Sequence, residues 1–255
     1  MKKGLISLLL AAVMTFSLLP STVCAEDSAW LELQQAVKSG GTVTLTRDVV
    51  CDNQDYGPIV VPEDVTVTID LNGYTIDRKL TEAVDLGAVF NVYGNLTVKD
   101  GSSGKTGTIT GGKNIGADNT MVAGGIQVSG GSLVLESGSI TGCSSDRRGA
   151  GVNIESGSFL MKGGSVSGNR AVSHGAGVSV SSGTFTMTGG IISGNYANTG
   201  AGVCASVADL ILSGGEISGN TARDNAGGLN TFGTSNVTLT GCKITGNTAP
   251  KAGGV

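Results

Sequence analysis

The sequence is poor in charge, in aromatic rings and in histidine. Charged residues make up 14% of the 255 residues, aromatic residues 4%, and His174 is the single histidine. One histidine excludes metal sites built from several histidines and leaves no supporting pattern for a Ser-His-Asp catalytic set. The nonapeptide repeat that binds Ca²⁺ is also missing. We therefore predict neither a metal site nor a cofactor.

The sequence also lacks a basic stripe. The formal net charge is −4, from 16 basic and 20 acidic residues. Nucleic-acid-binding domains carry a strongly basic face, because contacts to phosphate supply most of their affinity. We therefore predict that the chain does not bind nucleic acid.

Glycine, by contrast, is abundant, with 43 residues, and much of it belongs to a repeat. A glycine followed by an aliphatic residue recurs at steps of 25 or 26 residues, and three further apolar columns keep the same period. The pairs are Gly125-Ile126, Gly151-Val152, Gly177-Val178, Gly202-Val203, Gly228-Leu229 and Gly254-Val255. The columns are Leu133, Phe159, Phe185, Leu210 and Val237; Leu135, Met161, Met187, Leu212 and Leu239; and Ile140, Val166, Ile192, Ile217 and Ile244.

Within each run the apolar residues lie two apart, as in Phe185 and Met187. This is the period of a strand and not of a helix. Three short strands joined by tight turns then form one coil of about 26 residues, and like columns stack from coil to coil. We predict an all-β fold, a parallel β-helix with three short strands per coil, in which Phe159 lies on Phe185 and Met161 on Met187.

Asparagine follows the third column at the same place in four coils, and Cys143 occupies that place one coil earlier. Buried amide side chains need hydrogen-bond partners. We predict that these asparagines form a structural ladder that satisfies turn carbonyls from coil to coil. They are Asn169, Asn195, Asn220 and Asn247.

Residues 1–25 have the pattern of a secretory signal peptide: Lys2 and Lys3, an apolar run and a small-residue cleavage site. The run is too short to cross a membrane as a stable span. We therefore predict a secreted or cell-surface location, with no membrane span in the mature chain.

Residues 26–40 predict a short amphipathic helix, with Trp30, Leu33 and Val37 on one face. A β-helix has an open apolar end with unpaired strand edges, so we expect this helix to cap the amino end. Residues 41–255 then form one solenoid domain of about seven complete coils.

The last residues, Ala252 to Val255, repeat the opening of another coil. A terminal coil needs a cap to cover its apolar surface and strand edges. We therefore expect the solenoid to be truncated here or to continue beyond Val255.

The four cysteines outside the signal peptide fall in different columns of the repeat. Disulfides form in extracellular proteins, yet this spacing stacks no two of the thiols. We therefore favour no particular disulfide. The residues are Cys51, Cys143, Cys204 and Cys242.

The phrases VTIDLNGYTI at residues 67–76 and NLTVKDG at residues 95–101, with the repeated GAGV and ISGN, resemble secreted bacterial β-helix proteins of the pectate-lyase-like type. The resemblance covers nearly the whole chain after the signal peptide. It implies a right-handed parallel β-helix and export. Proteins of this architecture include surface adhesins, and also polysaccharide lyases that hold Ca²⁺ beside a basic residue.

The densest group of charges in the repeats is a corner column that includes Asp146, Arg148 and His174. Arg148 and His174 are one period apart and are expected to stack. A cationic corner can bind an acidic sugar, so these three are the candidate catalytic residues if the chain is an enzyme. The alternative is a solvated turn rich in charge.

An outward row of the second strand is unusually apolar, with Val134, Leu160 and Ile211 beside two threonines. We predict that these three form a contact face for a cell-surface polysaccharide or protein. The alternative is β-propensity alone. A second outward row is polar and is expected to be solvated; it holds Gln127, Asn153, Ser179, Cys204 and Asn230.

These features favour a secreted, non-enzymatic β-helical scaffold that presents a flat surface for adhesion or another cell-surface interaction. The alternative is a polysaccharide lyase or glycoside hydrolase on the same scaffold. Because function lies in a site and not in a fold, the arrangement of the outward side chains decides between them.

Overall fold

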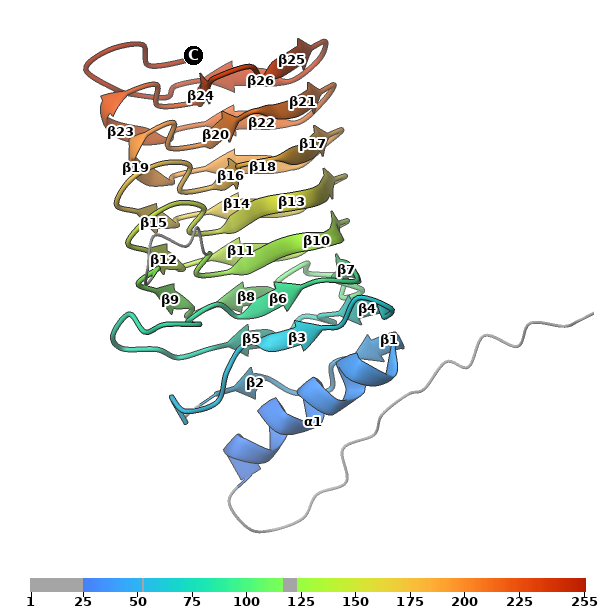
Figure 1. Cartoon of the computed structure of the whole chain (residues 1–255). Coiled ribbons are helices and arrows are strands. Elements are labelled where there is room, and N and C mark those ends of the chain that lie inside the picture. The colour runs from blue at the N-terminus through green and yellow to red at the C-terminus, as the bar shows by residue number, and fades with distance from the viewer. Residues whose placement is uncertain (1–24, 52, 117–122) are drawn as a thin grey trace, which may run out of the picture.

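The computed structural model is a parallel β-solenoid with one helix at its amino end (Figure 1). It describes residues 25–51, 53–116 and 123–255. The all-β class and the coil of three strands are confirmed. The expected signal peptide lies outside the described residues, apart from Ala25.

The largest sheet, sheet A, has 13 strands, and every pairing in it is parallel. It combines the first two strands of each coil, which run together as one strand in β10 (Ile126–Leu135) and β13 (Val152–Met161). The first strands are otherwise β3 (Ile59–Val61), β6 (Phe90–Val92), β16 (Val178–Val180), β20 (Val203–Ser206) and β24 (Leu229–Phe232). The second strands are β1 (Gly41–Thr44), β4 (Thr66–Asp70), β7 (Asn95–Lys99), β17 (Gly183–Met187), β21 (Ala208–Leu212) and β25 (Asn236–Leu239).

The third strands form sheet B, which has 8 strands. In the described chain seven coils have all three strands, as expected, and β1 and β2 make a partial first coil beside the helix. The strands are β2 (Val49–Val50), β5 (Thr75–Asp77), β8 (Thr108–Thr110), β11 (Ser139–Thr141), β14 (Ser165–Ser167), β18 (Ile191–Ser193), β22 (Glu216–Ser218) and β26 (Lys243–Thr245).

A further sheet, sheet C, has 5 short strands and was not predicted from the sequence. Its strands follow the corner after the third strand of five coils and stack on one side of the solenoid (Figure 1). They are β9 (Lys113–Asn114), β12 (Ser144–Ser145), β15 (Arg170–Ala171), β19 (Tyr196–Thr199) and β23 (Thr221–Asn225).

The apolar columns stack as predicted. Phe159 pairs in register with Phe185, and Met161 with Met187. All four side chains are buried, and the two phenyl rings stack with centroids 5.0 Å apart. Such an aromatic pair contributes about 0.5–1.5 kcal/mol beyond the burial of its area. Each coil therefore buries its neighbour's core side chains.

The helix α1 (Ala25–Ser39) covers the amino end of the solenoid, as expected (Figure 1). Trp30 and Val37 are fully buried, and Leu33 is buried beside them. Trp30 Nε1 donates a hydrogen bond to the Gly57 carbonyl at 3.3 Å. Trp30 is therefore part of the core. In the described part of the chain no helix is long and apolar enough to cross a membrane.

At the opposite end the core columns are open to solvent. Val237 and Leu239 of β25 are 39% and 47% exposed, whereas Leu210 and Leu212 one coil below are fully buried. Within the described chain no strand lies over β25.

Candidate functional site

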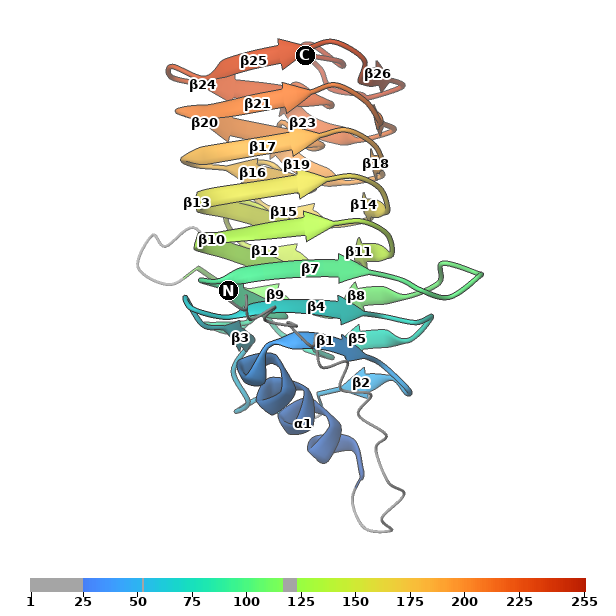
Figure 2. The same cartoon turned by 90° about the vertical axis from the view of Figure 1, so that its right-hand side faces the viewer.

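The apolar outward row lies on the outer face of sheet A. Figure 2 shows β4, β7, β10, β13, β17, β21 and β25 stacked one above another on this side. Val134 pairs in register with Leu160, and Ile211 lies two coils further on, with Thr186 between. Val134 and Leu160 are half-buried, and Ile211 is 41% exposed. The structure therefore brings the three predicted binding residues onto one face.

A shallow cleft borders this apolar row. It has a volume of about 280 Å³ and is lined by Thr184, Asp209, Asn236 and the exposed Val207. Thr184, Asp209 and Asn236 form the outward row two residues before that of Ile211. Polar groups and apolar side chains therefore lie side by side on late coils of sheet A.

The polar outward row is buried, so the expectation that it is solvated is wrong. Gln127, Asn153, Ser179 and Cys204 are 4%, 0%, 2% and 3% exposed, and Asn230 is half-buried. Asn153 Nδ2 donates to Gln127 Oε1 at 3.0 Å. Outward side chains on this part of sheet A are thus covered by another part of the chain.

The covering segments are the loops that lead from sheet C back into sheet A. A Cβ atom on Gly149 would lie 2.5 Å from Asn153 Cβ, and one on Gly175 would lie 3.0 Å from Cys204 Cβ. Both glycines have positive φ, 61° and 57°. Glycine is needed here for the close approach and for the backbone angle. Small buried side chains of these loops and of sheet C pack in one cluster: Ala150, Ala171, Ala176, Ala197, Ala201 and Ala222.

The candidate catalytic residues are only partly brought together. Arg148 and His174 lie side by side in parallel register, as predicted, and the amide of Gly149 donates to the His174 carbonyl at 3.2 Å. Asp146 is exposed just after β12. Among the described residues its carboxylate forms no ion pair with His174. Two of the three candidate catalytic residues, Arg148 and His174, are therefore neighbours on adjacent coils.

His174 lies in a half-buried corner with an aromatic neighbour. Its ring meets Phe232 edge-on, with centroids 5.1 Å apart. Burial, and to a smaller extent the Arg148 guanidinium, lowers the pKa of His174 below its ordinary value of 6.5. The imidazole is therefore neutral at pH 7, and the positive charge of the corner comes from arginine.

Cys204 lies near this corner but is not a nucleophile at neutral pH. Burial raises the pKa of its thiol to about 11, although the charge of Arg148 and a hydrogen bond with Asn230 oppose the shift. The thiolate is the reactive form of cysteine. None of the four cysteines outside residues 1–25 forms a disulfide in the described chain.

The predicted asparagines form a continuous ladder. Asn169 Nδ2 donates to the Ile140 carbonyl at 3.1 Å and to Asn195 Oδ1 at 3.1 Å. The same two bonds recur from Asn195 and from Asn220, and Asn247 Nδ2 donates to the Ile217 carbonyl. Each asparagine side chain thus donates a hydrogen bond to a backbone carbonyl of the preceding coil, and the first three also donate one to the asparagine of the next coil.

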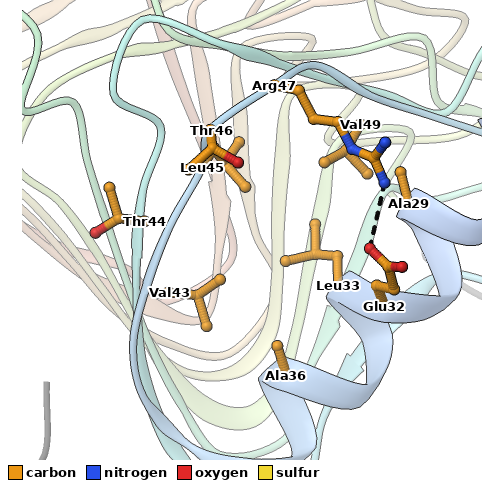
Figure 3. A pocket seen from close by; sticks show the side chains of 10 residues that line it. All are labelled: Ala29, Glu32, Leu33, Ala36, Val43, Thr44, Leu45, Thr46, Arg47 and Val49. Carbon is orange, nitrogen blue, oxygen red and sulfur yellow. Dashed lines mark hydrogen bonds and ion pairs between the residues drawn. The ribbon is translucent and has the colours of Figure 1, made fainter. Parts of the chain in front are cut away.

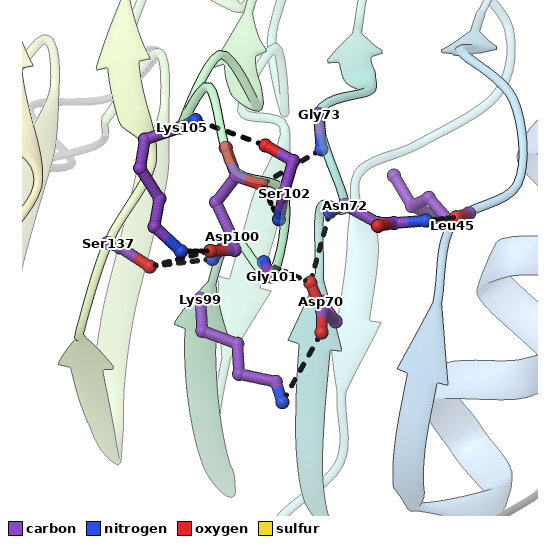
Figure 4. Close-up of polar contacts among 10 residues, drawn as sticks. All are labelled: Leu45, Asp70, Asn72, Gly73, Lys99, Asp100, Gly101, Ser102, Lys105 and Ser137. Carbon is purple, nitrogen blue, oxygen red and sulfur yellow. Dashed lines mark hydrogen bonds and ion pairs between the residues drawn. The ribbon is translucent and has the colours of Figure 1, made fainter.

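An acidic corner that the sequence analysis missed stabilises the early coils (Figure 4). Asp100 is buried, and its carboxylate accepts hydrogen bonds from the amides of Gly73, Ser102 and Gly107 at 2.9, 3.0 and 2.6 Å. Burial raises the pKa of Asp100, but the hydrogen bonds from Ser102, Gly107 and Gly73 together outweigh it and hold the pKa below 3.8. The sequence feature that could have indicated this corner is an aspartate directly before a turn glycine, as in the KDG of residues 99–101.

Asp70 has the same role one coil earlier. Its Oδ1 accepts from the amides of Asn72 and Gly101, and Lys99 Nζ lies 3.3 Å from its Oδ2 (Figure 4). Both carboxylates are occupied by backbone donors and link adjacent coils. The described residues contain no group of three or more His, Cys, Asp or Glu placed to hold a metal ion.

A small apolar pocket lies between α1 and the first coil (Figure 3). Leu33 and Val43 point into it, and the ion pair between Glu32 and Arg47, 3.3 Å apart, closes one side. Its volume of about 30 Å³ leaves room for only a few water molecules, since a cavity needs about 10–15 Å³ of such space to hold one. The pocket is therefore a packing gap between helix and solenoid, too small for a sugar.

Comparisons with protein-family models, with curated proteins and with solved structures found no match.

Proposed function

We propose that the protein is a secreted, non-enzymatic β-helical scaffold that binds a polysaccharide or protein at the cell surface through the outer face of sheet A. The observation that carries this proposal is the apolar row of Val134, Leu160 and Ile211, held in register on a flat sheet. Apolar groups grouped on a rigid outer surface mark interaction sites. β-Propensity alone does not account for Leu160, because leucine is not among the residues enriched in strands.

The cleft beside Ile211 supports the same face. Its polar lining residues, Thr184, Asp209 and Asn236, can hydrogen-bond a ligand whose apolar surface rests on the row. An interface of this kind combines an apolar centre with polar groups at its edge.

The chemistry of the corner formed by Arg148 and His174 favours binding over catalysis. Glycoside hydrolysis commonly uses two carboxylates that flank the scissile bond. Asp146 is the one carboxylate among the predicted catalytic residues, and it is solvent-exposed. A neutral imidazole and a guanidinium suit contact with an acidic sugar better than its cleavage.

The test replaces Leu160 and Ile211 together with lysine. We expect binding of the labelled protein to intact bacterial cells, measured by flow cytometry, to fall about tenfold or more, because two apolar contacts become charged. Ile191→Lys is the matched control, since Ile191 is 46% exposed on the outer face of sheet B.

If the double variant binds cells as well as the original protein, the outer face of sheet A is not the contact face. The protein could instead release unsaturated or reducing ends from pectate or alginate, and Arg148→Ala or His174→Ala could abolish that release. That result would show that the protein is an enzyme and not a non-enzymatic scaffold.

A further inference from the structure

Four of the six arginines of the chain lie on the sheet C side of the upper coils. Arg147 and Arg148 come just after β12. Arg170 begins β15, and Arg223 lies within β23. Figure 1 shows these strands, with β19 between β15 and β23, stacked on one side of the rod. Arginine is therefore concentrated on one side of the solenoid.

This side of the upper coils carries a net positive charge. Two aspartates lie beside the arginines: Asp146 is exposed, and Asp224 forms an ion pair with Lys251 at 3.3 Å. Four arginines and one lysine thus stand against two aspartates, in a chain whose formal net charge is −4. The loop of residues 78–87, lower on the same side, carries exposed residues of both signs. The basic region therefore belongs to the upper coils.

Three of these arginines have no counter-ion within the protein. Arg147, Arg170 and Arg223 are exposed, and in the described chain none of them forms an ion pair. Lys99 and Lys162, by contrast, each lie within 3.3 Å of a carboxylate. Exposed cations that are grouped on one surface attract an anionic ligand. We call Arg147, Arg170 and Arg223 the arginine face.

Arg170 is held in a defined position by Tyr196. Its guanidinium stacks over the tyrosine ring, 4.4 Å from the ring centroid. Such stacking uses the flat face of the guanidinium and leaves the N–H groups at its edge available. The fork of N–H donors matches two oxygens of a carboxylate or of a phosphate. Arg170 is therefore positioned to bind an anionic group.

The arginine face is too wide for one small anion. Arg147 and Arg223 lie three coils apart, or about 14 Å at the usual strand spacing. Ser144 pairs in register with Arg170, so Arg147 lies three residues further along the strand direction, or about 10 Å. Several anionic groups of one polymer can therefore bind to this face together, which raises the affinity for the polymer.

Hydroxyl groups lie among the arginines. Ser144, Tyr196 and Thr221 share one outward row with Arg170, since each pairs in register with its neighbour on the next coil. A hydroxyl group both donates and accepts hydrogen bonds. This row can therefore bind the hydroxyl groups of a sugar while the arginines bind its anionic groups.

We propose that the arginine face binds a linear glycan that carries anionic groups, either carboxylate or phosphate. Carboxylate and phosphate share the chemistry that a guanidinium recognises, so the face itself favours neither. Nucleic acid fits less well, because its binding relies on a strongly basic domain and this chain has a formal net charge of −4.

Biolayer interferometry of the immobilised protein measures binding to three purified glycans: alginate, which carries carboxylates, phosphorylated dextran, and unmodified dextran. We expect one or both of the anionic glycans to bind, and the neutral dextran not to bind. Arg170→Glu with Arg223→Glu should raise the dissociation constant about tenfold or more, because two attractive charges become repulsive. At about 1 M salt the binding should be lost, because the Debye length is then about 3 Å.

Lys38→Glu with Lys243→Glu is the matched control. Both lysines are exposed, on α1 and on β26, and the double variant changes the net charge by the same amount. We expect it to change the dissociation constant less than about twofold, because distant charges are screened. Arg170→Gln with Arg223→Gln removes the two charges without reversing them, and tests the same contacts if the glutamate variant does not fold.

The proposal is wrong if neither anionic glycan binds, or if unmodified dextran or DNA binds as tightly as they do. It is also wrong if the lysine control loses as much affinity as the arginine variants, since net charge and not this face would then explain the binding. The arginine face is separate from the outer face of sheet A, so these results leave the proposed contact through sheet A untouched.

Discussion

Asn195 shows how much one polar side chain contributes inside the solenoid. Its Nδ2 donates to the Val166 carbonyl at 3.0 Å and to Asn220 Oδ1 at 2.9 Å. Its Oδ1 accepts from the backbone amide and from Nδ2 of Asn169, at 3.0 and 3.1 Å. The side chain is buried, and both ends of its amide are occupied. Fully paired networks of this kind stabilise a unique stacking of the coils.

We expect Asn195→Ala to lower the free energy of unfolding by about 2–4 kcal/mol, because it leaves the Asn169 amide and the Val166 carbonyl buried without their partner. Urea denaturation measures the change. Asn198→Ala is the control, a half-buried residue of β19 for which we expect less than about 0.5 kcal/mol. Equal urea midpoints for the two variants would show that the ladder adds no stability.

The ladder could be predicted from the sequence, whereas the burial of Asn153 could not. Asn195 recurs with the period, and a recurring amide beside a core column needs an inward partner. Asn153 points outward by strand alternation, which predicts exposure. Its burial depends on the path of the loop at Gly149, which the repeat of the apolar residues does not predict. The glycines of that loop were the one feature of the sequence that indicated a close approach of the backbone.

The helix α1 is the element that covers the first coil. Trp30 has no exposed surface, and Leu31 beside it in sequence is 44% exposed. This contrast follows from the helical period, which turns successive residues toward different sides. The amphipathic pattern therefore predicted both the helix and its buried face.

We expect Trp30→Ala to destabilise the protein by about 3–5 kcal/mol, the usual cost of removing a large buried aromatic side chain. Leu31→Ala is the matched control and should change stability by less than about 0.5 kcal/mol. Thermal unfolding followed by circular dichroism measures both. If Trp30→Ala and Leu31→Ala unfold at the same temperature, the helix does not stabilise the solenoid.

Sheet C is the element that sequence reasoning missed. Strand prediction depends on alternation over several residues, and β9, β12 and β15 have only 2 residues each. Such segments are extended because stacked coils hydrogen-bond to one another, not because of their own propensity. The charges of this region were noted in the sequence, but their common surface depends on sheet C.

For the whole molecule, stability is expected to be a sum over coils and their interfaces. Deleting residues 177–201 joins Ala176 to Gly202 at equivalent points of the repeat, so Phe159 would stack on Leu210. We expect this variant to fold with the same circular dichroism signature and a lower midpoint of unfolding.

A matched deletion of residues 177–189 removes about half a coil. It breaks the register and turns core side chains outward, so we expect an aggregated or unfolded product. Size-exclusion chromatography separates the two outcomes. If both deletions aggregate, the coils do not behave as interchangeable units.

The four cysteines described above lie at four heights along the rod. Cys51, Cys143 and Cys204 are buried, Cys242 in the last coil is partly exposed, and burial raises the pKa of the Cys143 thiol to about 12. A buried, protonated thiol reacts with an alkylating reagent only when its surroundings open. The rate at which each thiol is labelled therefore measures local opening at its own level, and mass spectrometry of one time course would give the order in which the coils separate.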